Sequence, residues 1–142
     1  MLHELYDQVY ISQSTWRELI VGTARYPSSY MLSQREWLHV EEVELDTQLA
    51  RRLQHLDPAE IDSIALAIRL EADLLLIDER LGTHAAREMG FTTTGAVGVL
   101  LLAKEEGLID KIGPVLHEMR TTGGFRLHDR FVNKVLRDAG ER

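Results

Sequence analysis

The chain has 142 residues, the length of one ordinary domain, and its composition of 44% hydrophobic and 27% charged residues excludes a disordered protein. It contains no cysteine, which excludes disulfides, a thiol nucleophile and cysteine-bound metal centres, and which is typical of a cytoplasmic protein. The net charge of −7 argues against nucleic-acid binding, unless several of the acids are gathered around a metal ion.

Strands and helices are expected to alternate along the chain. The clearest helix start is Asp57-Pro58-Ala59-Glu60, because Asp57 can cap, Pro58 suits the first turn, and Glu60 occupies the acid position of a capping box. Residues 74–77 form an apolar run bounded by acids, which predicts a strand buried on both faces of a parallel sheet.

The remaining segments follow from periodicity and from glycine, proline and capping residues. The other extended segments expected are 9–11, 37–43, 91–94 and 125–127, with a loop at 26–29 and a turn at 123–124. The helix that starts at Asp57-Pro58 is expected to be buried along Ile61, Ile64, Ala65 and Ile68. The other helices expected are one capped by Ser12 or Ser14 and one from about Thr47. Further along, helices are expected at 83–89 and 96–106, then one opened by Asp110 and one capped by Asp129.

This alternation predicts a single α/β domain over residues 1–142, with a central parallel sheet between two layers of helices. The longest apolar run, residues 96–103, is too short to cross a bilayer, and residues 1–10 carry charges instead of a signal peptide's apolar run. We therefore expect no membrane association.

Asp78 follows the predicted strand 74–77 directly. Ligands of open parallel sheets gather at the carboxyl ends of the strands, so Asp78 is a candidate metal-binding carboxylate. The alternative is a solvated loop acid or a helix cap. Arg80, two residues further on, is a candidate for contacting a substrate phosphate, although a surface arginine is the commoner case.

Three further acids are candidates for the same site. Glu60 and Asp62 open the helix before the 74–77 strand, where a capping role or attraction to the helix N-terminus explains them equally well. Glu18 is a single acid in an apolar helix, for which a surface position is the simpler interpretation. Two to four carboxylates from different elements would suit a hard cation such as Mg²⁺.

Other chemistries find little support. The six histidines have no spacing typical of a metal site, and the chain lacks the glycine-rich loops of nucleotide-binding proteins and the Gly-x-Ser-x-Gly turn of serine hydrolases. A metal-activated water attacking a phosphodiester needs neither cysteine nor serine, and it agrees with what the sequence contains.

Several sequence motifs belong together: Leu56 to Ala67, Ala72 to Gly82, Thr94 to Lys104, Gly107 to Ile109 and Gly123 to Leu127, with Val9 to Leu19. Taken together, these motifs resemble one group of PIN-domain proteins, DUF3368. The resemblance implies a PIN fold and a Mg²⁺- or Mn²⁺-dependent endoribonuclease similar to VapC toxins. It also implies RNA as substrate, a small antitoxin partner and a homo-oligomer, usually a dimer.

The resemblance carries specific roles to four positions, since Glu18, Glu60, Asp62 and Asp78 match the family's metal-binding and catalytic acids. Family members usually begin with a strand ending in Asp-Ala-Ser-Pro-Leu, whereas this sequence begins Met-Leu-His-Glu-Leu. Two smaller departures are Ala59, where a glycine is usual, and Thr83, where an arginine is usual.

Three hypotheses stay open at this point. The protein is a metal-dependent endoribonuclease of toxin type, or a catalytically inactive PIN-like protein that binds RNA or an antitoxin. The third is that the natural protein starts upstream of Met1 and carries the missing strand, which would favour the first hypothesis. A sheet without that strand predicts an exposed edge and pairing with another chain.

Overall fold

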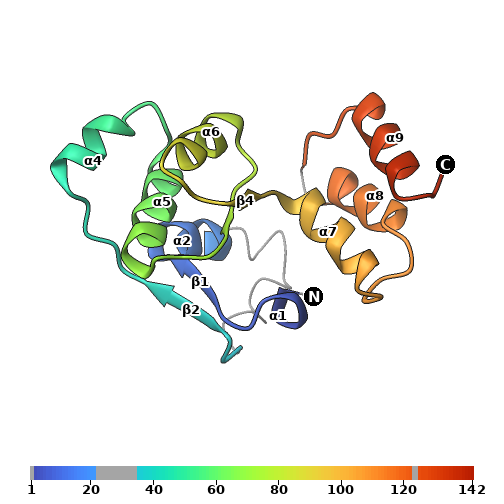
Figure 1. The fold of residues 1–142 in the computed structure, drawn as a ribbon, viewed down its shortest axis with the longest axis horizontal. Coiled ribbons are helices and arrows are strands. Elements are labelled where there is room, and N and C mark those ends of the chain that lie inside the picture. The colour runs from blue at the N-terminus through green and yellow to red at the C-terminus, as the bar shows by residue number, and fades with distance from the viewer. Residues whose placement is uncertain (1, 22–34, 123–124) are drawn as a thin grey trace. The chain divides into compact units, whose positions relative to one another are not determined.

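The computed structural model describes residues 2–21, 35–122 and 125–142. By their internal contacts these residues form two compact units, 2–96 and 97–142 (Figure 1). The expected loop at 26–29 and turn at 123–124 lie outside the described residues. The single domain over 1–142 stays a prediction.

The first unit contains all the strands that the structure describes. Its elements are α1 (Leu2–Leu5), β1 (Val9–Ser12), α2 (Gln13–Val21), β2 (Leu38–Glu41), α4 (Thr47–Arg52), α5 (Pro58–Leu70), β3 (Leu75–Leu76), α6 (Arg80–Glu88) and β4 (Thr93–Thr94). Most of these were predicted within a few residues of their observed ends; α1 was not predicted, and α6 begins three residues earlier than expected.

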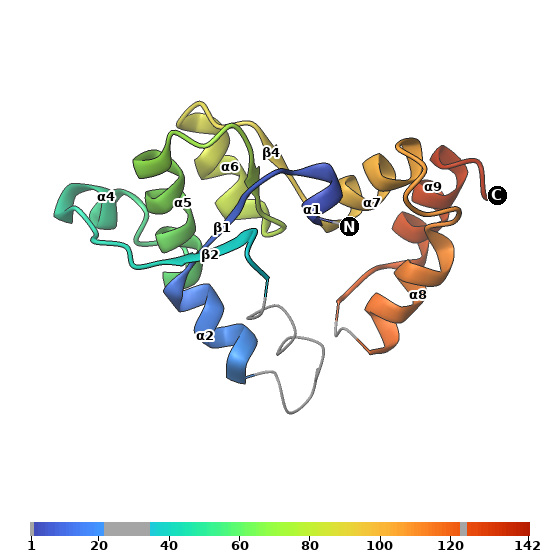
Figure 2. The same cartoon turned by 90° about the horizontal axis from the view of Figure 1, so that it is seen from below.

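The described strands form two parallel pairs. β1 pairs with β2, with Val9 opposite Leu38, and β3 pairs with β4, with Leu75 opposite Thr93. Figure 2 shows β1 and β2 side by side. Helix α5 packs against both β1 and β3, so one helix serves both pairs. The predicted α/β class with parallel strands is confirmed.

Local sequence explains how α5 begins. The Asp57 carboxylate accepts a hydrogen bond from the backbone N–H of Glu60 at 3.0 Å, and Glu60 Oε2 accepts one from the backbone N–H of Asp57 at 3.3 Å. Both bonds of the predicted capping box are present, and Pro58 lies in the first turn. This reciprocal arrangement fixes the N-terminal end of α5, where two of the candidate acids lie.

The core of the first unit lies between α4, α5, α6 and β3. Its buried members are Leu53, Leu56, Ile64, Ala67, Leu75, Ala85 and Ala86. Two expectations about burial were wrong. Ile68 is 40% exposed because the buried face of α5 runs through Leu66 and Ala67 instead. Leu76 is 38% exposed, on the opposite face of β3 from the buried Leu75.

The second unit is helical in its described part. It contains α7 (Ala96–Glu105, whose first residue belongs to the first unit), α8 (Gly113–Thr121) and α9 (Asp129–Asp138). The core residues are Leu100, Ile112, Leu116, Val135 and Leu136. None of the helices in the described ranges has the length and apolarity needed to cross a membrane.

Three local expectations failed in this unit. Residues 125–127 form no strand, and the described part of this unit contains no strand that could pair with them. Helix α8 begins at Gly113, three residues after Asp110. Asp129 is the first residue of α9, and the cap position is taken by His128, whose side chain makes no capping hydrogen bond.

A nearly buried ion pair joins the end of the chain to α7 and α8. The Glu141 carboxylate accepts hydrogen bonds from Lys104 Nζ at 2.9 Å and from the backbone N–H groups of Ile112 and Gly113 at 2.7 and 3.0 Å. Burial of the carboxyl opposes its ionisation, but these donors prevail and lower the pKa of Glu141 to about 2. Glu141 thus supplies the cap that the start of α8 lacks.

Candidate functional site

The four predicted site acids lie at different places on the first unit, and Asp78 lies nearest a strand end. Asp78 lies just beyond the carboxyl end of β3, as predicted, and is exposed. Its Oδ1 accepts a hydrogen bond at 2.8 Å from the backbone N–H of Ala96, the first residue of α7. The carboxylate therefore bridges the ends of β3 and β4 and satisfies one of the N–H groups at the start of that helix.

Gly95 lets the backbone approach this carboxylate. A Cβ at residue 95 would lie 2.6 Å from Asp78 Oδ1, closer than such atoms can approach without a shift. Gly95 follows β4 directly, so the absence of a side chain there keeps the end of the β3–β4 pair open around Asp78.

Glu60 occupies the start of α5 with its two oxygens in different roles. Oε2 completes the capping box, whereas Oε1 is buried and has no hydrogen-bond partner within the described part of the chain. A Cβ on Gly82 of α6 would lie 3.1 Å from that Oε1. Burial, with the nearby charges of Asp57 and Glu79, raises the pKa of Glu60, although the hydrogen bond from the Asp57 backbone opposes this.

The other two predicted acids differ in what they contact. Asp62 is half-buried on α5, and its Oδ2 accepts a hydrogen bond from the Ser14 hydroxyl of α2. Ser12 is buried and caps α2, since its Oγ accepts from the backbone N–H of Thr15 at 3.3 Å. Glu18 is exposed on α2, and the described residues show no hydrogen bond that joins it to the other acids.

The carboxylates meet a divalent cation's requirements in part. All the donors are oxygens, the type that Mg²⁺ and Mn²⁺ prefer, and Glu60 Oε1 is a buried carboxylate oxygen with no other partner described. Among residues 2–21, 35–122 and 125–142, however, no three His, Cys, Asp or Glu side chains lie together as a metal site requires. The donor chemistry fits the cation, whereas the grouping of all four predicted acids stays a prediction.

Arg80 is exposed at the first position of α6, two residues beyond Asp78. No hydrogen bond or ion pair holds its side chain in the described residues, so its guanidinium is available to a phosphate. Its predicted role in substrate binding stays a prediction.

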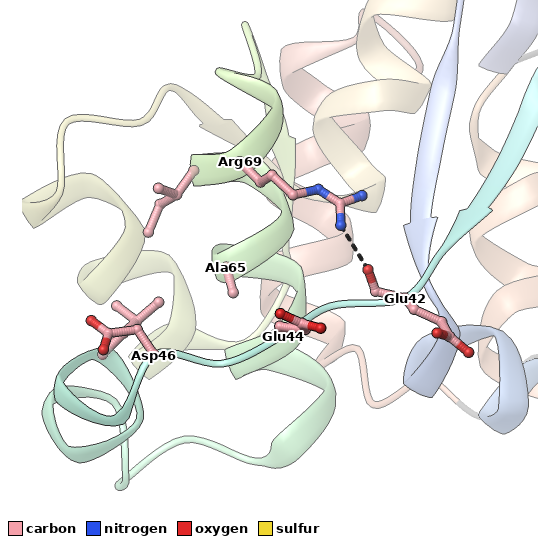
Figure 3. A pocket seen from close by; sticks show the side chains of 7 residues that line it. Glu42, Glu44, Asp46, Ala65 and Arg69 are labelled. Atoms are coloured by element: carbon pink, nitrogen blue, oxygen red, sulfur yellow. Dashed lines mark hydrogen bonds between the residues drawn. The ribbon is translucent and has the colours of Figure 1, made fainter.

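A hollow of about 550 Å³ lies on a different part of the unit, between α5 and the extended residues 42–46. Figure 3 shows the carboxylates of Glu42, Glu44 and Asp46 around it. Arg69 also lines it, but its guanidinium donates to the Glu42 carbonyl at 2.8 Å and to Glu41 Oε2 at 3.1 Å. The surplus of acids would repel phosphate, and none of the predicted site acids lines this hollow.

Sequence reasoning missed three residues that shape the candidate site: Ser14, Gly82 and Gly95. The two glycines had a signal in their positions, because a glycine beside a candidate acid often marks a close approach of the backbone. Ser14 was considered only as a helix cap. Its bond to Asp62 joins residues 48 positions apart, which no local pattern indicates.

Comparison with known proteins agrees with the α/β fold and its parallel strands. A model of the DUF3368 family, a PIN domain, matches residues 1–141. The chain therefore belongs to the DUF3368 family of PIN-domain proteins. PIN domains have a nuclease-type fold and generally use divalent metal ions. No curated protein and no solved structure has a significant match to the chain.

Proposed function

We propose that the protein is a metal-dependent endoribonuclease of the VapC-like toxin type, with its chemistry at the carboxyl end of the β3–β4 pair. The observation that carries the proposal is Asp78: an exposed carboxylate at a strand end, with a glycine beside it that keeps the backbone clear. Family membership supplies the nuclease-type fold.

In this proposal Asp78, Glu60 and Asp62 would hold a Mg²⁺ or Mn²⁺ ion, with Glu18 as the fourth acid. When bound, such an ion activates water and stabilises in-line attack on a phosphodiester. Glu60 brings a buried oxygen that lacks another described partner. Ser14 orients the Asp62 carboxylate through its hydrogen bond. Arg80 binds a substrate phosphate near Asp78.

The test is cleavage of a mixed RNA pool by the purified chain with Mn²⁺ or Mg²⁺, for the wild type, for Asp78→Asn and for Asp73→Asn. Asp73 is an exposed acid just before β3 and gives a matched change of charge. We expect the wild type and Asp73→Asn to cleave, and Asp78→Asn to lose about a hundredfold or more of the rate, since a metal ligand contributes several kcal/mol.

Asparagine can still accept the Ala96 N–H at position 78, so Asp78→Asn should remain folded, which circular dichroism checks. If the wild type shows no metal-dependent cleavage, or if Asp78→Asn cleaves as fast as the wild type, the proposed function is wrong.

A second candidate is a catalytically inactive PIN-like protein that binds RNA or an antitoxin. One observation favours it: the described residues bring no three metal-binding side chains together, and Asp78 and Glu60 each complete a helix start. This candidate expects RNA binding without cleavage in any metal. Cleavage that depends on Asp78 would exclude it.

We also propose the partners that the family resemblance implies, a small antitoxin and a second copy of the chain. Purification with a co-expressed antitoxin, and light scattering of the chain alone, test these two proposals separately. A monomer at every concentration would contradict the homo-oligomer.

A further inference from the structure

The two units differ sharply in charge. Residues 1–96 contain eight arginines and sixteen acids, a net charge of −8, whereas residues 97–142 contain eight basic residues and seven acids, a net charge of +1. The net charge of −7 for the whole chain therefore conceals a second unit that is slightly basic. Away from any bound cation, the second unit therefore opposes a polyanion less than the first unit does.

The basic character concentrates in the last seventeen residues. Residues 126–142 contain four arginines, one lysine and three acids. Each acid already has a cationic partner: Asp129 pairs with Arg120 at 2.8 Å, Asp138 with Lys134 at 3.2 Å, and Glu141 with Lys104 at 2.9 Å.

These pairs leave the arginines uncompensated. In the described part of the chain, no acid lies within ion-pair distance of Arg126, Arg130, Arg137 or Arg142. An ordinary solvated helix face has acids and bases that balance each other, whereas this segment presents unpaired arginine.

Three of the basic side chains lie on one face of helix α9. Arg130, Lys134 and Arg137 are spaced by four and three residues, which places them on one side of a helix. With His128, Phe131 and Asp138 they line a shallow depression, and the Asp138 carboxylate there is paired with Lys134. Val135 and Leu136 are buried in the core, so α9 keeps its apolar side inward and its cationic side outward.

Phe131 adds an aromatic surface to the same face. It is 43% exposed and lines the depression beside Arg130 and Lys134. Arginine forks match phosphate oxygens, and an exposed ring offers a stacking surface to any base. Cationic side chains alternating with an aromatic ring are how proteins track single-stranded nucleic acid.

We propose that the outer face of α9 binds single-stranded RNA, with Arg130 and Arg137 on the phosphate backbone and Phe131 stacking on a base. The choice of RNA rests on the proposed function. The surface belongs to the second unit and shares no residue with the carboxylate site.

The experiment measures binding without cleavage. A fluorescein-labelled, unstructured RNA oligonucleotide is titrated with the full chain in EDTA at several KCl concentrations, and anisotropy gives Kd. The variants are Arg130→Gln/Arg137→Gln, Arg130→Lys/Arg137→Lys and Phe131→Leu. The control is Arg51→Gln/Arg52→Gln, which removes two exposed arginines from α4 in the first unit.

We expect the α9 glutamine variant to weaken binding about fivefold or more, and to lower the slope of log K against log salt by roughly 1.4. The lysine variant should keep the slope, because the charges remain. Phe131→Leu should weaken binding about fivefold without changing the slope. The control should stay close to the wild type.

Four results would overturn the inference: no binding by the wild type, equal losses in the α9 and α4 variants, an unchanged slope in the α9 glutamine variant, or no effect of Phe131→Leu. The inference and the proposed function can fail separately. RNA binding that depends on α9, without cleavage in any metal, would contradict the nuclease and support the RNA-binding surface. Cleavage by the wild type, with RNA binding unaltered in the α9 variants, would support the nuclease and contradict the surface.

Discussion

Acids in the two units differ in how fully their carboxylate oxygens are hydrogen-bonded. In the second unit, Glu141 is 10% exposed and is surrounded by a lysine and two backbone N–H groups. In the first unit, Glu60 Oε1 is buried without a described partner, and Asp78 is exposed beside a glycine. A satisfied carboxylate stabilises a fold, whereas an unsatisfied or exposed one at a strand end is available for ligands. The contrast assigns a structural role to Glu141, whereas Asp78 and Glu60 keep carboxylate oxygens that the fold does not fully use.

The largest expected effect comes from a matched pair of core substitutions. Ile64 and Ile112 are each fully buried, one in each unit. Ile64→Ala and Ile112→Ala should each lower the free energy of unfolding by about 3 kcal/mol, from lost burial and a residual cavity. Urea unfolding followed by circular dichroism measures both.

The same experiment tests the predicted single domain. Both tryptophans, Trp16 and Trp37, belong to the first unit, so their fluorescence reports on that unit, whereas circular dichroism reports on both. A single domain predicts that the two signals coincide and that each variant shifts both. An Ile112→Ala transition seen by circular dichroism alone would mean that the units unfold independently.

The next largest expected effect on stability comes from removing the charge of Glu141. Glu141→Gln should lower the free energy of unfolding by about 2 kcal/mol, because it leaves the Lys104 charge without its partner in a mostly buried position. Asp138→Asn is the control, since its pair with Lys134 is exposed, and it should change stability by less than about 0.5 kcal/mol. Equal effects of the two would contradict the structural role of Glu141.

Low pH should remove the stabilisation that ionised Glu141 contributes. The pKa of Glu141 in the fold is about 2, below its ordinary value of 4.5. The ionised carboxyl therefore stabilises the fold fully above pH 4.5, and this contribution falls as the pH drops toward 2. Wild-type stability should fall faster than that of Glu141→Gln across this range. Parallel curves in acid-unfolding measurements would show that Glu141 does not carry the effect.

The smallest effect concerns the backbone next to Asp78. Gly95→Ala places a Cβ against Asp78 Oδ1, so the carboxylate must turn and weaken its bond to the Ala96 N–H. We expect the free energy of unfolding to fall by about 1 kcal/mol. The free energy of metal binding should fall by more than this. Thermal denaturation with and without Mn²⁺ measures both. Unchanged stability and metal affinity would mean that the close approach at Gly95 has no role.

Local chemistry was predictable from sequence. The capping box of Asp57 and Glu60 was found because its signals lie within four residues, and glycines 90, 107 and 140 follow helix ends with φ of 92°, 75° and 74°. Burial was less predictable, because the exposed fraction of Leu76 depends on which elements cover β3. Strand formation at 125–127 was also less predictable, because it needs a partner strand, and the described part of that unit has none.

The site was predictable in its residue types and not in its contacts. The position of Asp78 after a strand was correct, but its bond to Ala96 spans 18 residues, and the link from Asp62 to Ser14 spans 48. Such contacts depend on how α5 and the strands pack, which periodicity does not encode. The roles assigned to Glu18, Glu60, Asp62 and Asp78 stay predictions.

Calorimetric titration of the purified chain with Mn²⁺ tests the central claim, that the first unit holds a divalent cation through Asp78. We expect saturable binding by the wild type, similar binding by Asp73→Asn, and an affinity at least about tenfold lower for Asp78→Asn. Equal affinities in the wild type and Asp78→Asn, or no heat of binding in the wild type, would contradict it.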